Sequence, residues 1–237
     1  KGRHDTFMTT ELWSTQELTI ASEDIPLDDL SKFIRLETLV LEGSYDFSKL
    51  STLPMLKHLT VSGCTLNESD LEAIGGLTML ESLTISNCGI TSLNALSGLS
   101  ALTYLNASEN SISDISALST LTALQEINLS NNPITDLSAL ASNEVLTTLN
   151  VSGCQIKKLA SLKGKTTLVT LDLSNNKVAT LIALQECTAL TTLDISDNQI
   201  KDLSPIANLT SLQTLDASNN KLKNLPEYDN VFVSGND

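Results

Sequence analysis

The sequence predicts an α/β-type solenoid, in which a parallel β-sheet lines a concave face and 3₁₀ or other short turns form the convex face. Three observations predict this fold class. Leucine recurs every 22 residues, each interval contains one alternating L-x-L segment, and an Asn often follows that segment at a fixed distance. The leucines that set the interval are Leu80, Leu102, Leu124, Leu146, Leu168, Leu190 and Leu212. Self-similarity at a period of this size is typical of stacked repeats.

The repeating unit has the form L-x-x-L-x-L-x-x-N-x-I-x-x-L-x-x-L and is a leucine-rich repeat. Its L-x-L part predicts a short strand with two inward side chains. The Asn lies at the bend, where its amide can pair with backbone groups of the turning chain. The second half of a unit is too short for a long helix, so we expect 3₁₀ turns or extended chain there. In the stack, the asparagines should form a ladder of Asn110, Asn132, Asn176, Asn198 and Asn220.

We expect a single solenoid domain with modified ends, since one repeat cannot bury its apolar side alone. Residues 1–35 are predicted to hold an N-terminal helical cap and a divergent first repeat, 36–225 the regular repeats, and 226–237 a shortened C-terminal strand or cap. Short helices are expected at 24–34, where Asp24 could serve as N-cap, and at 67–76. The apolar residues expected in the N-terminal cap are Phe7, Met8, Leu12 and Trp13.

The composition excludes several classes of partner. The net charge of −14 disfavours nucleic acid and anionic membranes as partners. The sequence has no apolar run near the roughly 20 residues that a membrane helix needs, so we expect no membrane insertion. With 41% hydrophobic residues the chain can still bury a sizeable core, which leucine dominates.

Catalytic and metal-binding motifs are missing from the sequence, which has only two histidines. We therefore expect a non-enzymatic protein without cofactor or metal. Cys64, Cys88 and Cys154 occupy the Asn position of their repeats, whereas Cys187 replaces an inward leucine. The interpretation is four buried thiols that fill space in the core. A Cys64–Cys88 disulfide is the alternative, because neighbouring repeats lie about 5 Å apart.

The concave face is the predicted binding surface, because outward strand residues of successive repeats form columns there. The column before the second leucine contains mainly Thr and Ser, but His58, Tyr104 and Glu126 interrupt it. Glu109 similarly interrupts a column of Gly, Asn and Asp. Tyr is a typical anchor at recognition surfaces. We therefore take His58, Tyr104, Glu109 and Glu126 as candidate ligand-binding residues, with chance variation on an open sheet as the alternative.

A second departure is the row of Asp172, Asp194 and Asp216, which stacking would place about 5 Å apart. These carboxylates are also candidate ligand-binding residues, for a basic partner or a cation. A flat row does not supply the converging oxygens that calcium requires. The alternative is a local role, in solubility or in hydrogen bonds to Ser174, Ser196 and Ser218.

Two units, TTLDISDNQIKDLSPIANLTSL (191–212) and YLNASENSISDISALSTLTAL (104–124), resemble the 22-residue repeats of internalin-type bacterial surface proteins. The runs at 114–118, 136–140 and 202–206 are similar to the D-I-S-P-L element of that family. The resemblance covers about residues 36–225. It implies a right-handed horseshoe or arc, a cell-surface or secreted location, and adhesion through the concave face to a host or neighbouring-cell protein. The polar strand face itself leaves a glycan open as an alternative ligand. The resemblance assigns no individual binding residue.

Two alternatives stay open. The chain could be a structural spacer that presents another domain of a larger surface protein. It could also be a cytoplasmic regulator of an enzyme, because phosphatase-regulating proteins share the 22-residue period and free thiols suit a reducing compartment.

Overall fold

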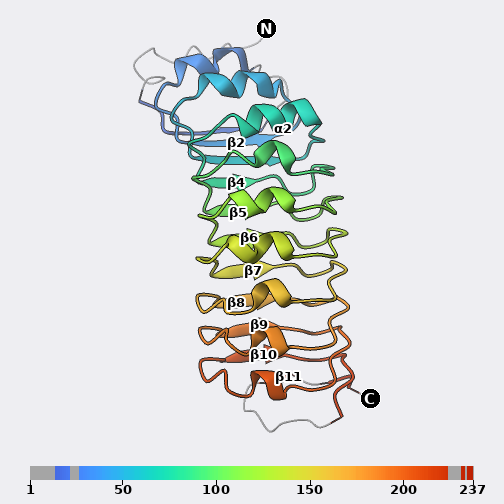
Figure 1. Cartoon of the computed structure of the whole chain (residues 1–237). Coiled ribbons are helices and arrows are strands. Elements are labelled where there is room, and N and C mark those ends of the chain that lie inside the picture. Colours follow the sequence, from blue (N-terminus) through green and yellow to red (C-terminus); the bar gives the residue numbers. More distant parts are fainter. Residues whose placement is uncertain (1–13, 22–26, 224–230, 233, 237) are drawn as a thin grey trace.

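The computed structural model describes residues 14–21, 27–223, 231–232 and 234–236, which form one elongated stack (Figure 1). Eleven strands pair in chain order into one parallel sheet. The strands are β1 (Glu17–Ile20), β2 (Thr38–Glu42), β3 (His58–Ser62), β4 (Ser82–Thr84), β5 (Tyr104–Asn106), β6 (Glu126–Asn128), β7 (Thr148–Asn150), β8 (Thr170–Asp172), β9 (Thr192–Asp194), β10 (Thr214–Asp216) and β11 (Val231–Phe232).

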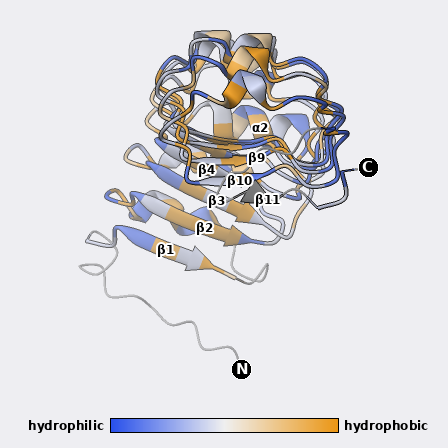
Figure 2. Cartoon of the chain, turned by 90° about the horizontal axis from the view of Figure 1, so that it is seen from below, coloured by the Kyte–Doolittle hydropathy of each residue, from blue (hydrophilic) through white to orange (hydrophobic). Residues whose placement is uncertain are grey.

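Short helices lie across the stack from the sheet (Figure 2). Those of the 3₁₀ type are η1 (Leu27–Lys32), η2 (Phe47–Thr52), η3 (Asn94–Leu96), η4 (Ser116–Thr120), η5 (Ser138–Ser142), η6 (Ala160–Leu162), η7 (Ile182–Leu184) and η8 (Ser204–Ile206). The described residues also hold the α-helix α2 (Glu68–Gly75), at the expected place. Its N-terminus has a capping box between Asn67 and Asp70. The predicted fold class, a parallel sheet backed by short turns, is confirmed.

The N-terminal helical cap is only partly visible. The helix expected at 24–34 is the 3₁₀ helix η1, while residues 24–26 lie outside the described residues. Phe7, Met8, Leu12 and Trp13 also lie outside them. A cap built from these apolar residues stays a prediction.

The sheet keeps the register that the 22-residue period requires. Leu105 pairs with Ile127, and Ile127 pairs with Leu149, so each inward residue stacks on its equivalent in the next repeat. We call one repeat with its strand and turns a rung. The buried aliphatic side chains form one continuous core from Ile20 to Leu222. No rung has a core of its own, so each is stabilised by its neighbours.

The asparagine ladder is confirmed, and its five members are buried. In Asn176, Nδ2 donates to Val151 O at 2.8 Å and to Leu173 O at 3.0 Å, while Oδ1 accepts from Ile156 N at 2.9 Å. Val151 and Ile156 belong to the preceding rung. The side chain therefore joins two rungs through backbone groups that lie outside the strands.

Polar residues enter the core at one inward position. Asn143, Lys165 and Cys187 occupy, in three successive rungs, the position that Leu99 and Leu121 fill elsewhere. Lys165 is only 4% exposed and donates from Nζ to Asn143 O at 2.8 Å. Burial lowers the pKa of this lysine from its ordinary value. Our sequence analysis identified only Cys187 here.

None of the four cysteines forms a disulfide, and three of them are buried. Cys64 is partly exposed, so the expectation that all four are buried is wrong for it. Cys154 Sγ donates to Leu129 O at 3.5 Å, and Cys88 Sγ contacts Ser86 O at 3.3 Å. Burial, with a smaller effect of the neighbouring Cys64, raises the pKa of Cys88 to about 12. The buried thiols thus replace the asparagine amide with a weaker hydrogen bond.

Candidate binding surface

One column of the sheet face consists of the residue that precedes the second leucine in each rung, and we call it the outer column. Strand register places His58 opposite Ser82, Ser82 opposite Tyr104, and Tyr104 opposite Glu126. His58 and Glu126 are exposed, and Tyr104 is half-buried. The three side chains that interrupt the Thr/Ser pattern therefore lie within four adjacent strands. The full column is Thr38, His58, Ser82, Tyr104, Glu126, Thr148, Thr170, Thr192 and Thr214.

Asp172, Asp194 and Asp216 form a row on adjacent strands, and their carboxylates accept local hydrogen bonds. Asp172 Oδ1 accepts from the backbone N of Ser174 at 2.9 Å and from its Oγ at 2.7 Å. Asp194 and Asp216 bind Ser196 and Ser218 in the same way. Asn106 and Asn150 make the equivalent bonds in other rungs. The geometry thus agrees with the local alternative, although each aspartate adds a charge that an asparagine would not.

The serines that follow the Asn or Asp position form a further column, of which Ser108, Ser130, Ser174 and Ser196 are buried. They lie where the chain leaves the sheet. In each case the backbone N of the serine donates to the side-chain Oδ1 of the Asn or Asp two residues earlier. This column is therefore part of the framework.

The residues after these serines adopt a left-handed backbone, with φ between 52° and 58° for all six non-glycine members. Gly, Asn and Asp tolerate this conformation, which explains their presence at Gly63, Asn131 and Asp197. Glu109, with φ of 58°, has no such tolerance and is exposed. The left-handed backbone at Glu109 therefore lowers the stability of the fold by about 1 kcal/mol.

The structure brings four of the seven candidate residues into one region. Tyr104 and Glu109 belong to the rung of β5, Glu126 lies on β6, and His58 lies on β3. The three aspartates lie on β8, β9 and β10, farther along the stack. The candidate residues therefore form two separate groups.

A charge feature that we did not use in the sequence analysis distinguishes the first group. No Lys or Arg occurs between Lys57 and Lys157, whereas nine acidic residues lie in that interval. Glu109 and Glu126 therefore lie on rungs that contribute no basic side chain. The signal was available in the sequence as a long interval without lysine or arginine.

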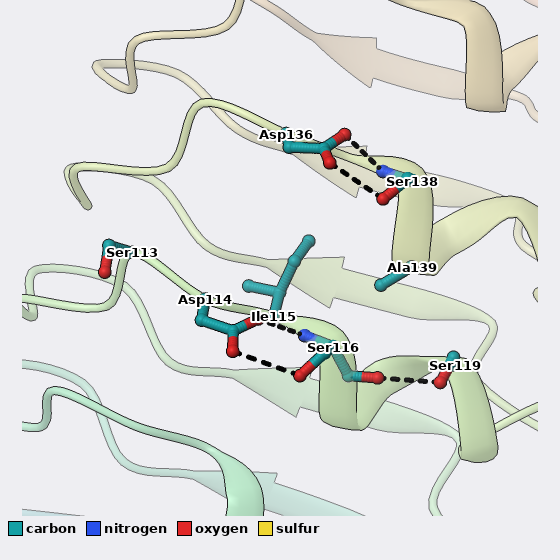
Figure 3. A pocket seen from close by; sticks show the side chains of 8 residues that line it. All are labelled: Ser113, Asp114, Ile115, Ser116, Ser119, Asp136, Ser138 and Ala139. Carbon is teal, nitrogen blue, oxygen red and sulfur yellow. Dashed lines mark hydrogen bonds between the residues drawn. The ribbon is translucent and has the colours of Figure 1, made fainter.

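A shallow pocket of about 230 Å³ lies between η4 and η5, away from the sheet face (Figure 3). Its two carboxylates each bind a nearby serine: Asp114 accepts from Ser116 N at 2.8 Å, and Asp136 accepts from Ser138 N at 2.9 Å. These bonds lower the pKa of Asp136. Each carboxylate is thus bonded to the first residue of its own 3₁₀ helix. Among the described residues, no group of three His, Cys, Asp or Glu side chains could hold a metal ion.

Comparison with protein families identifies the repeats. A model of leucine-rich repeats in two copies matches residues 100–142 and 188–230, and a single-repeat model matches 142–158 and 164–182. A comparison with curated protein sequences finds no match. None of the helices within the described ranges has the length and apolar character to span a membrane.

Solved structures with the same architecture include three internalins of Listeria monocytogenes. The chain is similar to InlF with 25% identity and a TM-score of 0.84, over 97% of this chain and 76% of InlF. Its similarity to InlC2 has 28% identity and a TM-score of 0.66, over 90% of this chain and 84% of InlC2. The functional domain of InlJ, which includes a cysteine ladder, matches with 26% identity and a TM-score of 0.68, over 92% of this chain and 47% of that one.

Proposed function

Because this chain is a leucine-rich repeat protein of the internalin type, we propose that it binds a protein partner through its sheet face. The activity is non-enzymatic, and the protein acts at a bacterial cell surface or in a secreted form. Similarity to the internalins supports the location, and the fold supports the mode of binding, since solenoids present extended surfaces.

One observation carries the placement of the site. His58, Tyr104 and Glu126 interrupt a column of Thr and Ser within four adjacent strands. Tyr104 offers an apolar ring with a polar tip, which suits an anchor at an interface. Glu109 extends the site to the edge of the sheet, where its backbone has the unfavourable left-handed conformation. We propose these four residues as the binding site, and we assign the aspartate row a secondary role.

The charge of this region indicates the chemistry of the partner. Glu109 and Glu126 are exposed on rungs without Lys or Arg. A partner that presents lysine or arginine would gain from electrostatic attraction, mainly through a faster association rate. We therefore propose a basic surface on a host or neighbouring-cell protein.

The test compares two triple variants of the intact chain in pull-down experiments against candidate partner proteins. The site variant carries His58→Ala, Tyr104→Ala and Glu126→Ala; the control carries Thr148→Ala, Thr170→Ala and Thr192→Ala in the same column. A partner that the wild type and the control retain, and the site variant loses, supports the proposal. Equal retention by both variants contradicts it. Melting curves confirm that both variants are folded.

The alternative of a structural spacer makes the opposite prediction for the sheet face. A spacer needs no ligand, so substitutions at His58, Tyr104 and Glu126 would change no function of the full-length protein. The unusual side chains of this column favour the binding role.

A further inference from the structure

Lysine is distributed very unevenly along this acidic chain. Residues 1–143 contain 18 acidic and six basic side chains, whereas residues 144–223 contain seven acidic side chains and eight lysines. The last rungs therefore carry almost no net charge in a protein whose total is −14. The positions of these lysines in the structure decide whether they form one continuous basic surface.

Five of the eight gather along one edge of the stack, just after the position of the asparagine ladder. This lysine strip consists of Lys157, Lys177, Lys201, Lys221 and Lys223, all exposed. Four successive rungs, those of β7 to β10, each contribute at least one member. The strip follows the edge at which the strands end, which is the side of the labelled C-terminus in Figure 1.

The backbone of this edge is regular enough to align the side chains. Lys177 N donates to Ile156 O at 2.9 Å, Gln199 N to Val178 O at 2.8 Å, and Lys221 N to Ile200 O at 2.8 Å. Ile156, Val178 and Ile200 point into the core, so the residues before and after them project outward. Lys177 Nζ also reaches Gln155 Oε1 of the previous rung at 3.3 Å.

The strip is poorly neutralised by the protein itself. Within the described ranges, ion pairs involve only Lys32, Lys49 and Lys57, none of which belongs to the strip. Asp202, the acidic neighbour of Lys201, already accepts from Ser204 N at 2.8 Å. Asp197 lies on the same rung and is exposed. Asp172, Asp194 and Asp216 end the strands of the same rungs, and each accepts hydrogen bonds from a serine. No carboxylate among the described residues forms an ion pair with a lysine of the strip.

We propose that the lysine strip binds an acidic polysaccharide. Rungs follow one another at about 4.8 Å, so the strip offers roughly one ammonium group per sugar ring of an extended chain. All five basic residues of the strip are Lys, and none is Arg. Lysine presents a compact, hydrated point charge, whereas arginine binds anions in a fixed bidentate geometry. The strip therefore suits a ligand that is recognised by its charge density. Protein interfaces are instead depleted in Lys at their centre.

Nucleic acid is the less suitable polyanion. Single-stranded nucleic acid is bound by grooves that combine positive charge with aromatic side chains for base stacking. From Lys157 to Lys223 the chain contains no Phe, Tyr or Trp. A polysaccharide with carboxylate or sulfate groups needs no such platform. The strip is also separate from the sheet-face site, so this inference stands independently of the proposed protein partner.

The experiment uses heparin as the probe and neutral dextran as its uncharged control, with the intact chain at pH 7 and about 20 mM salt. The strip variant carries Lys177→Gln, Lys201→Gln and Lys221→Gln. The matched control carries Lys32→Gln, Lys49→Gln and Lys163→Gln, and so has the same net charge. We expect at least a tenfold loss of heparin affinity in the strip variant and at most a twofold loss in the control. Binding of the wild type should weaken steeply with added salt.

Several results would overturn the proposal. These are no heparin binding by the wild type, equal losses in the two variants, or equal binding of dextran. Tighter binding of single-stranded DNA of matched charge would assign the strip to nucleic acid, and tighter binding of polyglutamate would assign it to an acidic protein segment. The strip variant should retain a protein partner that depends on His58, Tyr104 and Glu126, which separates the two proposals.

Discussion

Replacing Asn176 with Ala should destabilise the protein strongly, although the residue lies in no strand or helix. Its side chain is 8% exposed and is the partner that the structure gives to Val151 O and to Ile156 N. Leu173 O, by contrast, also accepts from Asn198 Nδ2 at 2.8 Å and stays paired. Two buried backbone groups would thus lose their partner, each at about 1–3 kcal/mol, so we expect a total of about 3 kcal/mol.

The chain suggests a graded variant, because Cys88 and Cys154 occupy the equivalent position. In Asn176→Cys the thiol can still reach the preceding carbonyl, as Cys154 Sγ reaches Leu129 O. Only Ile156 N then lacks an acceptor, so we expect a cost of about 1–2 kcal/mol. Asn175→Gly is the control, since Asn175 is exposed and has the left-handed φ that glycine accepts.

Urea unfolding followed by far-UV circular dichroism measures all three variants. The expected order of destabilisation is Ala, then Cys, then the Gly control, which should lie within about 0.5 kcal/mol of the wild type. If Asn176→Ala and Asn175→Gly unfolded at the same urea concentration, the hydrogen bonds of the asparagine ladder would contribute nothing to stability. A change in the slope m would instead indicate loss of two-state unfolding.

Three further predictions concern other positions. Glu109→Asn, which introduces the residue that the next rung has at Asn131, should stabilise the protein by about 0.5–1 kcal/mol in the same urea assay, because it relieves a left-handed glutamate; an unchanged midpoint would contradict this. Lys165→Met should change the stability at pH 7 by less than about 1 kcal/mol, because the gain from removing a buried charge is offset by leaving Asn143 O without its donor. Since the folded-state pKa of Lys165 lies below its ordinary value of 10.5, the unfolded chain binds more protons as pH approaches 10.5, so wild-type stability should rise relative to the variant over that range; a constant difference would exclude this cause. Cys88, whose pKa is raised to about 12, should resist iodoacetamide at pH 8 in the folded protein and react in urea, as mass spectrometry can show; rapid labelling of the folded protein would show that the thiol is accessible.

The sequence was most informative where one residue type recurs for one physical reason. The L-x-L spacing placed the strands, and the recurring asparagine predicted the ladder from Asn110 to Asn220. The turn residues were harder to interpret, because Gly63, Asn87 and Asp197 share a backbone conformation and not a chemical group. We placed that column on the concave face, although its composition already indicated positive φ.

Burial was less predictable than register. Lys165 and Asn143 stand at a leucine position, so the period alone places them inward, but composition normally assigns lysine to the surface. The binding site has no comparable signal: the framework residues recur because every rung needs them, whereas a ligand leaves only departures such as His58 and Tyr104.

The constant register has a consequence for how such a molecule changes over time. Tyr104, Glu126 and Thr148 occupy one position on β5, β6 and β7, and their backbone partners are equivalent. Removing the 22 residues from one equivalent position to the next would let β5 meet β7 with every hydrogen-bonding group still matched. Length is thus inherited in whole modules of about 4.8 Å each, whereas a residue inserted within a strand would move the side chains that follow it to the opposite face of the sheet. Recombination between repeat units can therefore change the length of the molecule while each intermediate sequence still folds.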